Sequence, residues 1–164
     1  MQVPLIDPAI TRVALRDGAV VWLVRHGETE WNAQRRLQGQ QDSPLTARGR
    51  QQASAIASLL ARTLPQDGTP IRLVSSPLGR TLATAAPIAA ALGLEAATDA
   101  RLAEIALGEW EGMTWAEIDA VYPGALDGAL PHERYFRAVG GESHRAMAER
   151  LGGWLGEADG ITVA

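Results

Sequence analysis

Cysteine and lysine are both absent from the 164-residue chain. Without cysteine, a disulfide framework, a thiolate nucleophile and a cysteine-ligated metal are all excluded. All 15 basic residues are arginine, and codon bias is the simpler explanation for most of them, since the choice of surface charge is weakly constrained. Individual arginines can still matter, because a guanidinium group matches phosphate oxygens in a bidentate way.

Long apolar runs and a strong net charge are also missing. No segment approaches the length needed to cross a bilayer, and Pro and Asp occupy the N-terminal stretch where a secretory signal would have a basic flank and an apolar run. The net charge of −4 gives no reason to expect nucleic acid or an anionic membrane as a partner. The 46% hydrophobic and 21% charged residues are typical of a folded domain. We therefore expect a soluble, cytoplasmic protein.

Strand-like and helix-like segments alternate along the chain, which predicts a three-layer α/β/α sandwich with a mainly parallel central sheet. The expected strands are 11–16 and 19–24, joined by a hairpin turn at Asp17-Gly18, and 71–74, 95–98 and 161–164. The expected helices are 46–64, 77–92, 114–121 and 143–158. The segment 123–141 is rich in Gly and Pro and predicts a loop.

The helix expected at 77–92 has Pro77 in its first turn and Pro87 as a kink. Helical spacing predicts that its buried face holds Leu78, Leu82, Ala85, Ala89 and Leu92.

The apolar run at the end of the chain stops at four residues, 161–164, whereas strands usually run to five or six. This favours a fragment, so residues 1–164 are expected to form a single domain that lacks its C-terminal portion. An open sheet edge at 161–164 would leave a homodimer or a strand swap as an alternative.

The stretch "VVWLVRHGETEWN" runs from an apolar strand directly into Arg25 and His26. Ligands of open α/β sheets collect outside the carboxyl ends of the strands, and Arg80 follows the end of another predicted strand. Taken alone, a histidine after a strand is more often a hydrogen-bonded structural residue, and an arginine in a first helical turn is usually solvent-facing. The combination of two arginines and a histidine at strand ends instead favours a phosphate site.

Neighbouring cations lower the pKa of an imidazole, because they disfavour its protonated form. A neutral imidazole nitrogen can attack phosphorus and form a phosphohistidine, which splits hydrolysis into two easier steps. The leaving alkoxide needs a proton, and the candidate donors are the carboxyl groups of Glu104, Glu109 and Glu111 in "RLAEIALGEWEG".

The stretch Leu23 to Asn32 closely resembles the signature of the histidine phosphatase superfamily, the phosphoglycerate mutase-like proteins. Three further stretches, "SSPLGRTLATA", "LAEIALGEWEG" and "GGES", are similar to later motifs of that family and occur in the same order. The segment "RRLQGQQDSPLTARGRQQA" also resembles the family, in register at Gly39, Asp42, Pro44, Leu45, Thr46, Gly49, Gln52 and Ala53. Four ordered motifs between about residues 20 and 163 are a strong signal, whereas Arg-His-Gly alone would be weak.

The resemblance implies a role for each matching residue. His26 would accept the phosphoryl group, Arg25 and Arg80 would clamp it, and Glu104 would be the general acid. Asn32 would contact phosphate oxygens, and Gln38 and Gly39 would line the substrate side. The other motif residues are expected to be structural: Glu28 and Thr29 as supports around the nucleophile, and Glu109 and Glu111 on a surface turn.

The family also has a second active-site histidine, in a Ser-His-Gly motif that this sequence does not reach. The remaining histidines, His132 and His144, are expected to be surface residues. Losing a preorganised donor to a transition-state oxyanion costs on the order of a hundredfold in rate. We therefore expect this chain by itself to be weakly active or inactive.

The resemblance predicts a phosphomonoester hydrolase that acts on small phosphorylated metabolites, such as sugar phosphates, nucleotides or cofactor precursors, without a cofactor or a metal. Two alternatives stay open: a phosphoglycerate mutase-type phosphoryl transferase, and a non-catalytic module that binds an anion. A metal-dependent hydrolase is disfavoured, because the sequence offers no His/Asp cluster at ligand spacing.

Overall fold

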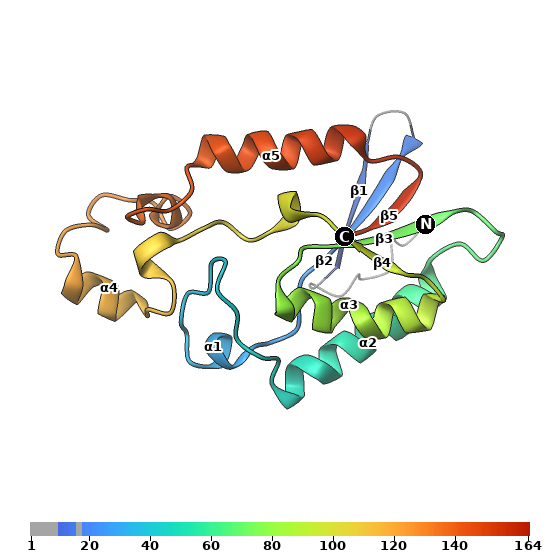
Figure 1. The fold of residues 1–164 in the computed structure, drawn as a ribbon, viewed down its shortest axis with the longest axis horizontal. Helices are drawn as coiled ribbons and strands as arrows, with labels where there is room; N and C mark the ends of the chain where they lie inside the picture. Colours follow the sequence, from blue (N-terminus) through green and yellow to red (C-terminus); the bar gives the residue numbers. More distant parts are fainter. Residues whose placement is uncertain (1–9, 16–17) are drawn as a thin grey trace.

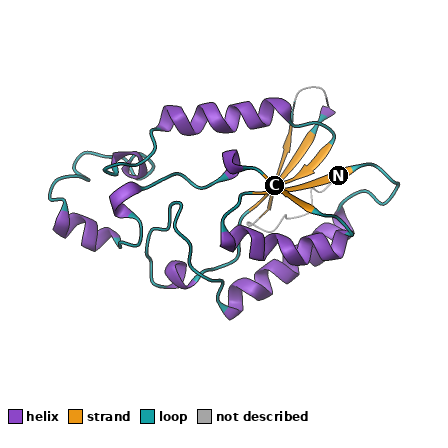
Figure 2. Ribbon diagram, in the orientation of Figure 1, coloured by secondary structure: helices purple, strands orange, loops and turns teal. Residues whose placement is uncertain are grey.

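The computed structural model of the chain describes residues 10–15 and 18–164. Their five strands form one sheet in the order β1-β2-β5-β3-β4 (Figures 1 and 2). The strands are β1 (Ile10–Ala14), β2 (Val20–Val24), β3 (Ile71–Ser75), β4 (Ala96–Thr98) and β5 (Ile161–Val163). Only β1 runs antiparallel to its neighbour, and the other three pairings are parallel.

Helices lie on both faces of this sheet, with α5 on one side and α2 and α3 together on the other (Figure 1). The α-helices are α1 (Glu30–Ala33), α2 (Ala47–Thr63), α3 (Gly79–Leu92), α4 (Trp115–Val121) and α5 (His144–Glu157). The 3-10 helices are η2 (Ala100–Leu102), η3 (Gly108–Trp110) and η4 (Arg134–Arg137). The fold is therefore α/β with a mainly parallel sheet, as the alternation of segments predicts. None of the helices within the described ranges is long and apolar enough to cross a membrane.

Local capping signals in the sequence mark where three of the helices begin. The hydroxyl groups of Thr46 and Ser143 accept hydrogen bonds from the backbones of α2 and α5, and Thr114 forms the predicted capping box with Glu117 at the start of α4. The hairpin between β1 and β2 is also confirmed by their antiparallel register. Of its turn residues, Asp17 lies outside the described residues.

Of two sequence predictions about α3, one is wrong and the other is correct only in part. The helix begins at Gly79, so Pro77 lies before its first turn rather than in it. On the predicted buried face, Ala85 is buried and Ala89 and Leu92 pack against the apolar core, but Leu82 is 39% exposed. The helix buries Arg80, Thr84 and Ile88 as well. The start differs because the carboxylate of Asp42, from a distant loop, accepts the hydrogen bonds of the first backbone N–H groups of α3.

The expected free edge at 161–164 is also wrong. β5 is the central strand, paired with β2 on one side and β3 on the other. The edges of the described sheet are β1 and β4. Strand order is set by long-range packing, which the local apolar pattern of β5 does not reveal.

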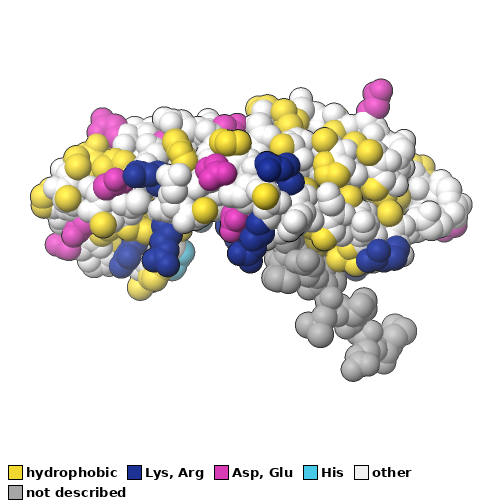
Figure 3. Space-filling model, turned by 90° about the horizontal axis from the view of Figure 1, so that it is seen from below, with side chains coloured by type: hydrophobic (Ala, Val, Ile, Leu, Met, Phe, Trp, Pro, Cys, Tyr) yellow, Lys and Arg dark blue, Asp and Glu magenta, His cyan; other side chains and the backbone are white. Residues whose placement is uncertain are grey.

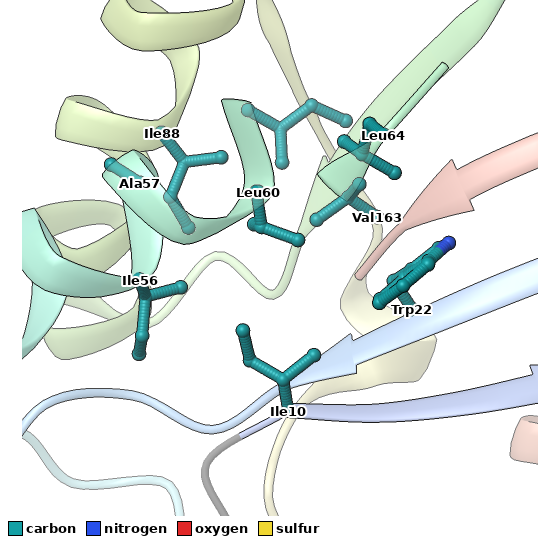
Figure 4. Packing of buried hydrophobic residues seen from close by; sticks show 9 residues of the cluster. Ile10, Trp22, Ile56, Ala57, Leu60, Leu64, Ile88 and Val163 are labelled. Atoms are coloured by element: carbon teal, nitrogen blue, oxygen red, sulfur yellow. The ribbon is translucent and has the colours of Figure 1, made fainter. Parts of the chain in front are cut away.

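The apolar residues form two separate clusters. The sheet core lies between the sheet and the pair α2 and α3, with Trp22, Val163 and Leu60 among its members (Figure 4). The second cluster is built on Ile105, Leu107, Trp110 and Ile118, from the 105–118 segment. The candidate site lies where residues from the strand ends meet residues packed on this second cluster.

Candidate active site

A pocket of about 560 Å³ opens at the carboxyl ends of β2 and β3. All seven residues singled out in the sequence line it, although they come from separate segments of the chain. They are Arg25, His26, Asn32, Gln38, Gly39, Arg80 and Glu104. Figure 3 shows basic side chains in several separate places on the face seen from below, some of them next to acidic side chains.

His26 is half-buried directly after β2, and its orientation is fixed by its neighbour. Its Nδ1 lies 2.8 Å from the carbonyl oxygen of Gly27. A proton on Nδ1 makes that hydrogen bond, which leaves Nε2 unprotonated and available as a nucleophile. The sequence therefore places a pre-oriented imidazole in the lining of the pocket.

Burial lowers the pKa of His26 below its ordinary value of 6.5, because the charged imidazolium is poorly solvated there. The positive charges of Arg80 and Arg25 lower the pKa further, while the Gly27 carbonyl and the negative charge of Glu104 act in the opposite direction. The direction agrees with the sequence-based argument. The largest cause is burial rather than the neighbouring cations.

The loop after His26 is held by close backbone packing. The backbone N–H of Gly27 donates a 3.0 Å hydrogen bond to the hydroxyl of Thr84, on α3. A Cβ atom at Gly27 would lie 2.3 Å from the carbonyl oxygen of Gly49, and one at Gly49 would lie 2.0 Å from the carbonyl oxygen of Glu28. Only glycines allow α2 to approach this loop so closely.

Arg80 is the most buried charged residue of the pocket, 2% exposed. One terminal nitrogen, Nη1, donates to the carbonyl of Gln41 at 2.8 Å and to the carboxylate of Asp42 at 3.0 Å. The other, Nη2, donates to the carbonyl of Gly39 at 2.8 Å. Its Nε has no hydrogen-bond partner within the described part of the chain. Both terminal nitrogens of the guanidinium group are thus held by the protein, and the buried Nε–H remains free to donate.

Arg25 differs from Arg80 in being exposed. The ion pairs found among residues 10–15 and 18–164 do not include it. Its charge is therefore available to an anion in the pocket.

A buried threonine orients the two amide side chains of the pocket. The hydroxyl of Thr29, a fully buried residue, lies 3.0 Å from the side-chain oxygen of Asn32 and 3.0 Å from that of Gln38. Because both amide oxygens face Thr29, the NH₂ groups are left to donate elsewhere. The supporting role expected for Thr29 is seen here in the hydrogen bonding, and it also caps α1.

The acidic residues of the 104–111 segment have different surroundings. Glu104 is exposed at the pocket, and its carboxylate accepts a hydrogen bond from the backbone N–H of Ile105 at 2.9 Å. Glu109 is exposed, as expected for a surface turn, and its carboxylate accepts a hydrogen bond from the hydroxyl of Tyr122. Glu111 does not fit the expected surface turn, because its half-buried carboxylate accepts the N–H groups of Gln40 and Leu107. Glu111 therefore joins the two loops that form the pocket.

The other histidines lie away from the pocket lining. His132 and His144 are both exposed, and the ring of His144 contacts Phe136 edge to face at 5.1 Å. Across the described residues, no group of three or more His, Cys, Asp or Glu side chains could hold a metal ion.

The chain is similar to known proteins over most of its length. Residues 21–160 match the sequence model of the histidine phosphatase superfamily (branch 1). A glucosyl-3-phosphoglycerate phosphatase of Mycolicibacterium vanbaalenii is 42% identical over 128 residues, 78% of this chain and 54% of that protein. A Citrobacter koseri protein named "Probable phosphoglycerate mutase GpmB" is 43% identical over 139 residues, 80% of this chain and 59% of that protein. The chain thus spans little more than half the length of these relatives.

Solved structures show the same fold. YhfR of Bacillus stearothermophilus is 36% identical, with a TM-score of 0.72 over 88% of this chain and 71% of YhfR. A mycobacterial glucosyl-3-phosphoglycerate phosphatase in complex with VO3 is 35% identical, with a TM-score of 0.66 over 87% of this chain and 72% of that one.

Proposed function

Because this chain belongs to branch 1 of the histidine phosphatase superfamily, we propose that its pocket hydrolyses small phosphomonoesters through a phosphohistidine at His26. The observation that carries the proposal is the geometry of that imidazole. Its Nδ1 is bound to the Gly27 carbonyl, and its pKa is lowered by burial and by the two arginines. Nε2 is therefore neutral near physiological pH and faces a site with fixed positive charge.

In the first step, Arg25 and the unused Nε of Arg80 bind the phosphate oxygens. The lone pair of Nε2 attacks phosphorus, an N–P bond forms, and the P–O bond to the alcohol breaks. The leaving oxygen takes a proton from the carboxyl group of Glu104. In the second step, the Glu104 carboxylate takes a proton from water as that water attacks phosphorus. The N–P bond breaks, and inorganic phosphate leaves.

The amide groups of Asn32 and Gln38 fit the same chemistry. The oxygen of Asn32 accepts the backbone N–H of Thr29 and that of Gln38 faces the Thr29 hydroxyl, so both NH₂ groups can donate to phosphate oxygens as negative charge builds up on them. Gly39 contributes through its carbonyl, which holds Arg80. We also propose that the chain acts as one domain, since the pocket draws its lining from residues as far apart as Val24 and Leu151.

A mutase-type phosphoryl transfer is the second candidate, and it is supported by the relatives that bear the phosphoglycerate mutase name. Both reactions share the phosphohistidine. They differ in whether water or a second hydroxyl group takes the phosphoryl group.

The test is to incubate the protein with radiolabelled phosphomonoester and to look for acid-labile, base-stable label on the chain, alongside phosphate release from p-nitrophenyl phosphate. His26→Asn should abolish the label, whereas His132→Asn, at an exposed position outside the pocket, should retain it. Label without transfer to added phosphoglycerate supports the phosphatase. Tight vanadate binding with no label on the chain would instead support an anion-binding module and overturn the proposal.

A further inference from the structure

The pocket is larger than a phosphate group requires, and most of its remaining wall is apolar. Its volume of about 560 Å³ lies in the range of pockets that hold whole small molecules. Three segments supply the apolar and aromatic side chains of this wall: Ile105 and Leu107 of the 105–118 segment, Tyr135 and Phe136 of η4, and Met147 and Leu151 of α5.

Two further arginines line the pocket, but carboxylates already hold both of them. Arg36 donates to Glu117 and to the carbonyl of Gly112, each at 2.8 Å. Arg150 forms a two-pronged pair with Glu142, at 2.6 and 2.7 Å. These side chains therefore bring little net charge to the wall.

Arg150 is also held from a second side, because its Nη1 donates to the carbonyl of Arg101 at 2.6 Å. Arg25, beside His26, also lines the pocket. Among the described residues it forms no ion pair with a carboxylate, unlike Arg36, Arg80 and Arg150. Arg80 adds an unused Nε at the same place. One phosphate group uses this charge, and a second anionic group would meet paired arginines and the carboxylate of Glu104.

Aromatic contacts fix the rings of the wall in place. Tyr135 is 38% exposed, and its ring lies edge to face against Trp115, with centroids 5.3 Å apart. Phe136 packs on the second cluster and makes the edge contact with His144. Pre-positioned rings bind a flat apolar group with little loss of conformational entropy.

We infer that the pocket selects phosphomonoesters whose alcohol part is uncharged and apolar or aromatic, in preference to those that carry a second anionic group such as a carboxylate. This inference rests on the proposed function for the placement of the phosphate at His26. It assigns Tyr135 as a residue that determines specificity.

The test measures binding rather than turnover, because aryl leaving groups react faster for purely chemical reasons. Dissociation constants for phenylphosphonate, methylphosphonate and phosphonoacetate are measured by calorimetry on the whole chain. Phenylphosphonate should bind about threefold to tenfold more tightly than methylphosphonate, as expected for one well-placed aromatic contact. Phosphonoacetate should gain nothing over methylphosphonate from its carboxylate.

Variants then locate the effect. Tyr135→Ala should reduce the phenyl-to-methyl ratio, and Tyr135→Phe should preserve it, because the ring and not the hydroxyl makes the contact. Leu130→Ala is the matched control, since Leu130 is 56% exposed in the same 123–141 segment and does not line the pocket. It should leave the ratio unchanged.

Tighter binding of phosphonoacetate than of phenylphosphonate would overturn the inference, as would an unchanged ratio in Tyr135→Ala or no binding of any phosphonate. The proposed function fails separately, if His26 takes no label while the order of the three phosphonates holds. The ranking in the unmodified chain keeps the inference testable even if a variant folds poorly.

Discussion

The carboxylate of Asp42 holds both the charged group of Arg80 and the start of the helix that carries it. One oxygen lies 3.0 Å from Nη1 of Arg80 and 3.2 Å from its backbone nitrogen, and the other accepts the N–H of Gly79. The side chain of Asp42 thus fixes Arg80 at two points, its backbone nitrogen and its guanidinium group.

Replacing Asp42 should therefore affect stability and anion binding together. Asp42→Ala leaves the buried Arg80 without its counter-charge and the first turn of α3 without a cap, and should cost about 2 kcal/mol of the free energy of unfolding. Urea denaturation gives this quantity, and calorimetry with vanadate gives the affinity, which should also fall. Asp119→Ala, at an exposed position on α4, is the control. If Asp42→Ala had the same free energy of unfolding as the unmodified chain, the role assigned to Asp42 would be wrong.

Thr29 should matter for the pocket although it does not line it. Thr29→Val keeps the shape of the side chain but removes the hydroxyl that faces the amide oxygen of Gln38 and caps α1, while the backbone N–H still holds Asn32. We expect a loss of about 1–2 kcal/mol in unfolding free energy and weaker vanadate binding. Thr29→Ser retains the hydroxyl and should restore most of the affinity. If the valine and serine variants bind vanadate equally well, the orienting role is wrong.

Titration of His26 can be followed by the imidazole proton resonance that disappears in His26→Asn. Its pKa should lie below 6.5, because burial and the two arginines favour the neutral ring. Arg25→Gln should move the pKa up towards 6.5. At His26 the folded chain binds fewer protons than the unfolded chain. The contribution of His26 to the free energy of unfolding is therefore fully present above about pH 6.5 and is lost as the pH falls through the folded pKa. A pKa above 6.5 in the folded protein would contradict this account.

Glu142 should make stability depend on pH in a more acidic range. Its hydrogen bonds with Arg150 hold its pKa below the ordinary value of 4.5. The stabilisation is present above that value and is lost as the pH falls through the folded pKa. Glu142→Gln should destabilise the protein at about pH 7, and the difference from the unmodified chain should shrink at about pH 4.

The matched control for Glu142 is Glu149→Gln, in the exposed pair with Arg145 on α5, the helix that carries Arg150. It should have little effect at either pH, because exposed pairs contribute little. A gap between the unmodified chain and Glu142→Gln that stays constant with pH would count against the ion pair.

Two glycine-to-alanine changes should have opposite effects on the free energy of unfolding. Gly49→Ala places a Cβ atom 2.0 Å from the Glu28 carbonyl oxygen, so α2 must move away from the loop that carries His26. We expect it to destabilise by more than about 2 kcal/mol. In Gly152→Ala, on α5, nothing lies within 4 Å of the new atom, and the higher helix propensity of alanine should stabilise by about 0.5–1 kcal/mol. Thermal unfolding of both variants checks the pair.

The sequence was sufficient for much of the fold because its signals there are local. Periodic apolar residues and the caps at Thr46, Thr114 and Ser143 predict helices that the structure contains. The gathering of Arg25, His26 and Arg80 could also be predicted, since the carboxyl ends of parallel strands meet at one edge of a sheet.

Features that depend on the path of a loop could not be predicted in this way. Asp42 lies 38 residues before its partner Arg80, and no periodicity connects the two. The cap that Asp42 supplies shifts the start of α3, which explains why Pro77 was misplaced. The central position of β5 and the half-buried place of Glu111 likewise come from packing between distant segments.

The second cluster has a consequence for how such proteins diverge. His26 and Arg80 are set by the sheet and by α3, whereas Phe136 and Met147 pack on Ile105, Leu107 and their neighbours, outside the sheet core. Substitutions in the second cluster should therefore reshape the wall, and through Ile105 the position of Glu104, while His26 keeps its place after β2. A lineage built on this scaffold could thus change what the wall contacts by steps that each leave the imidazole of His26 in place.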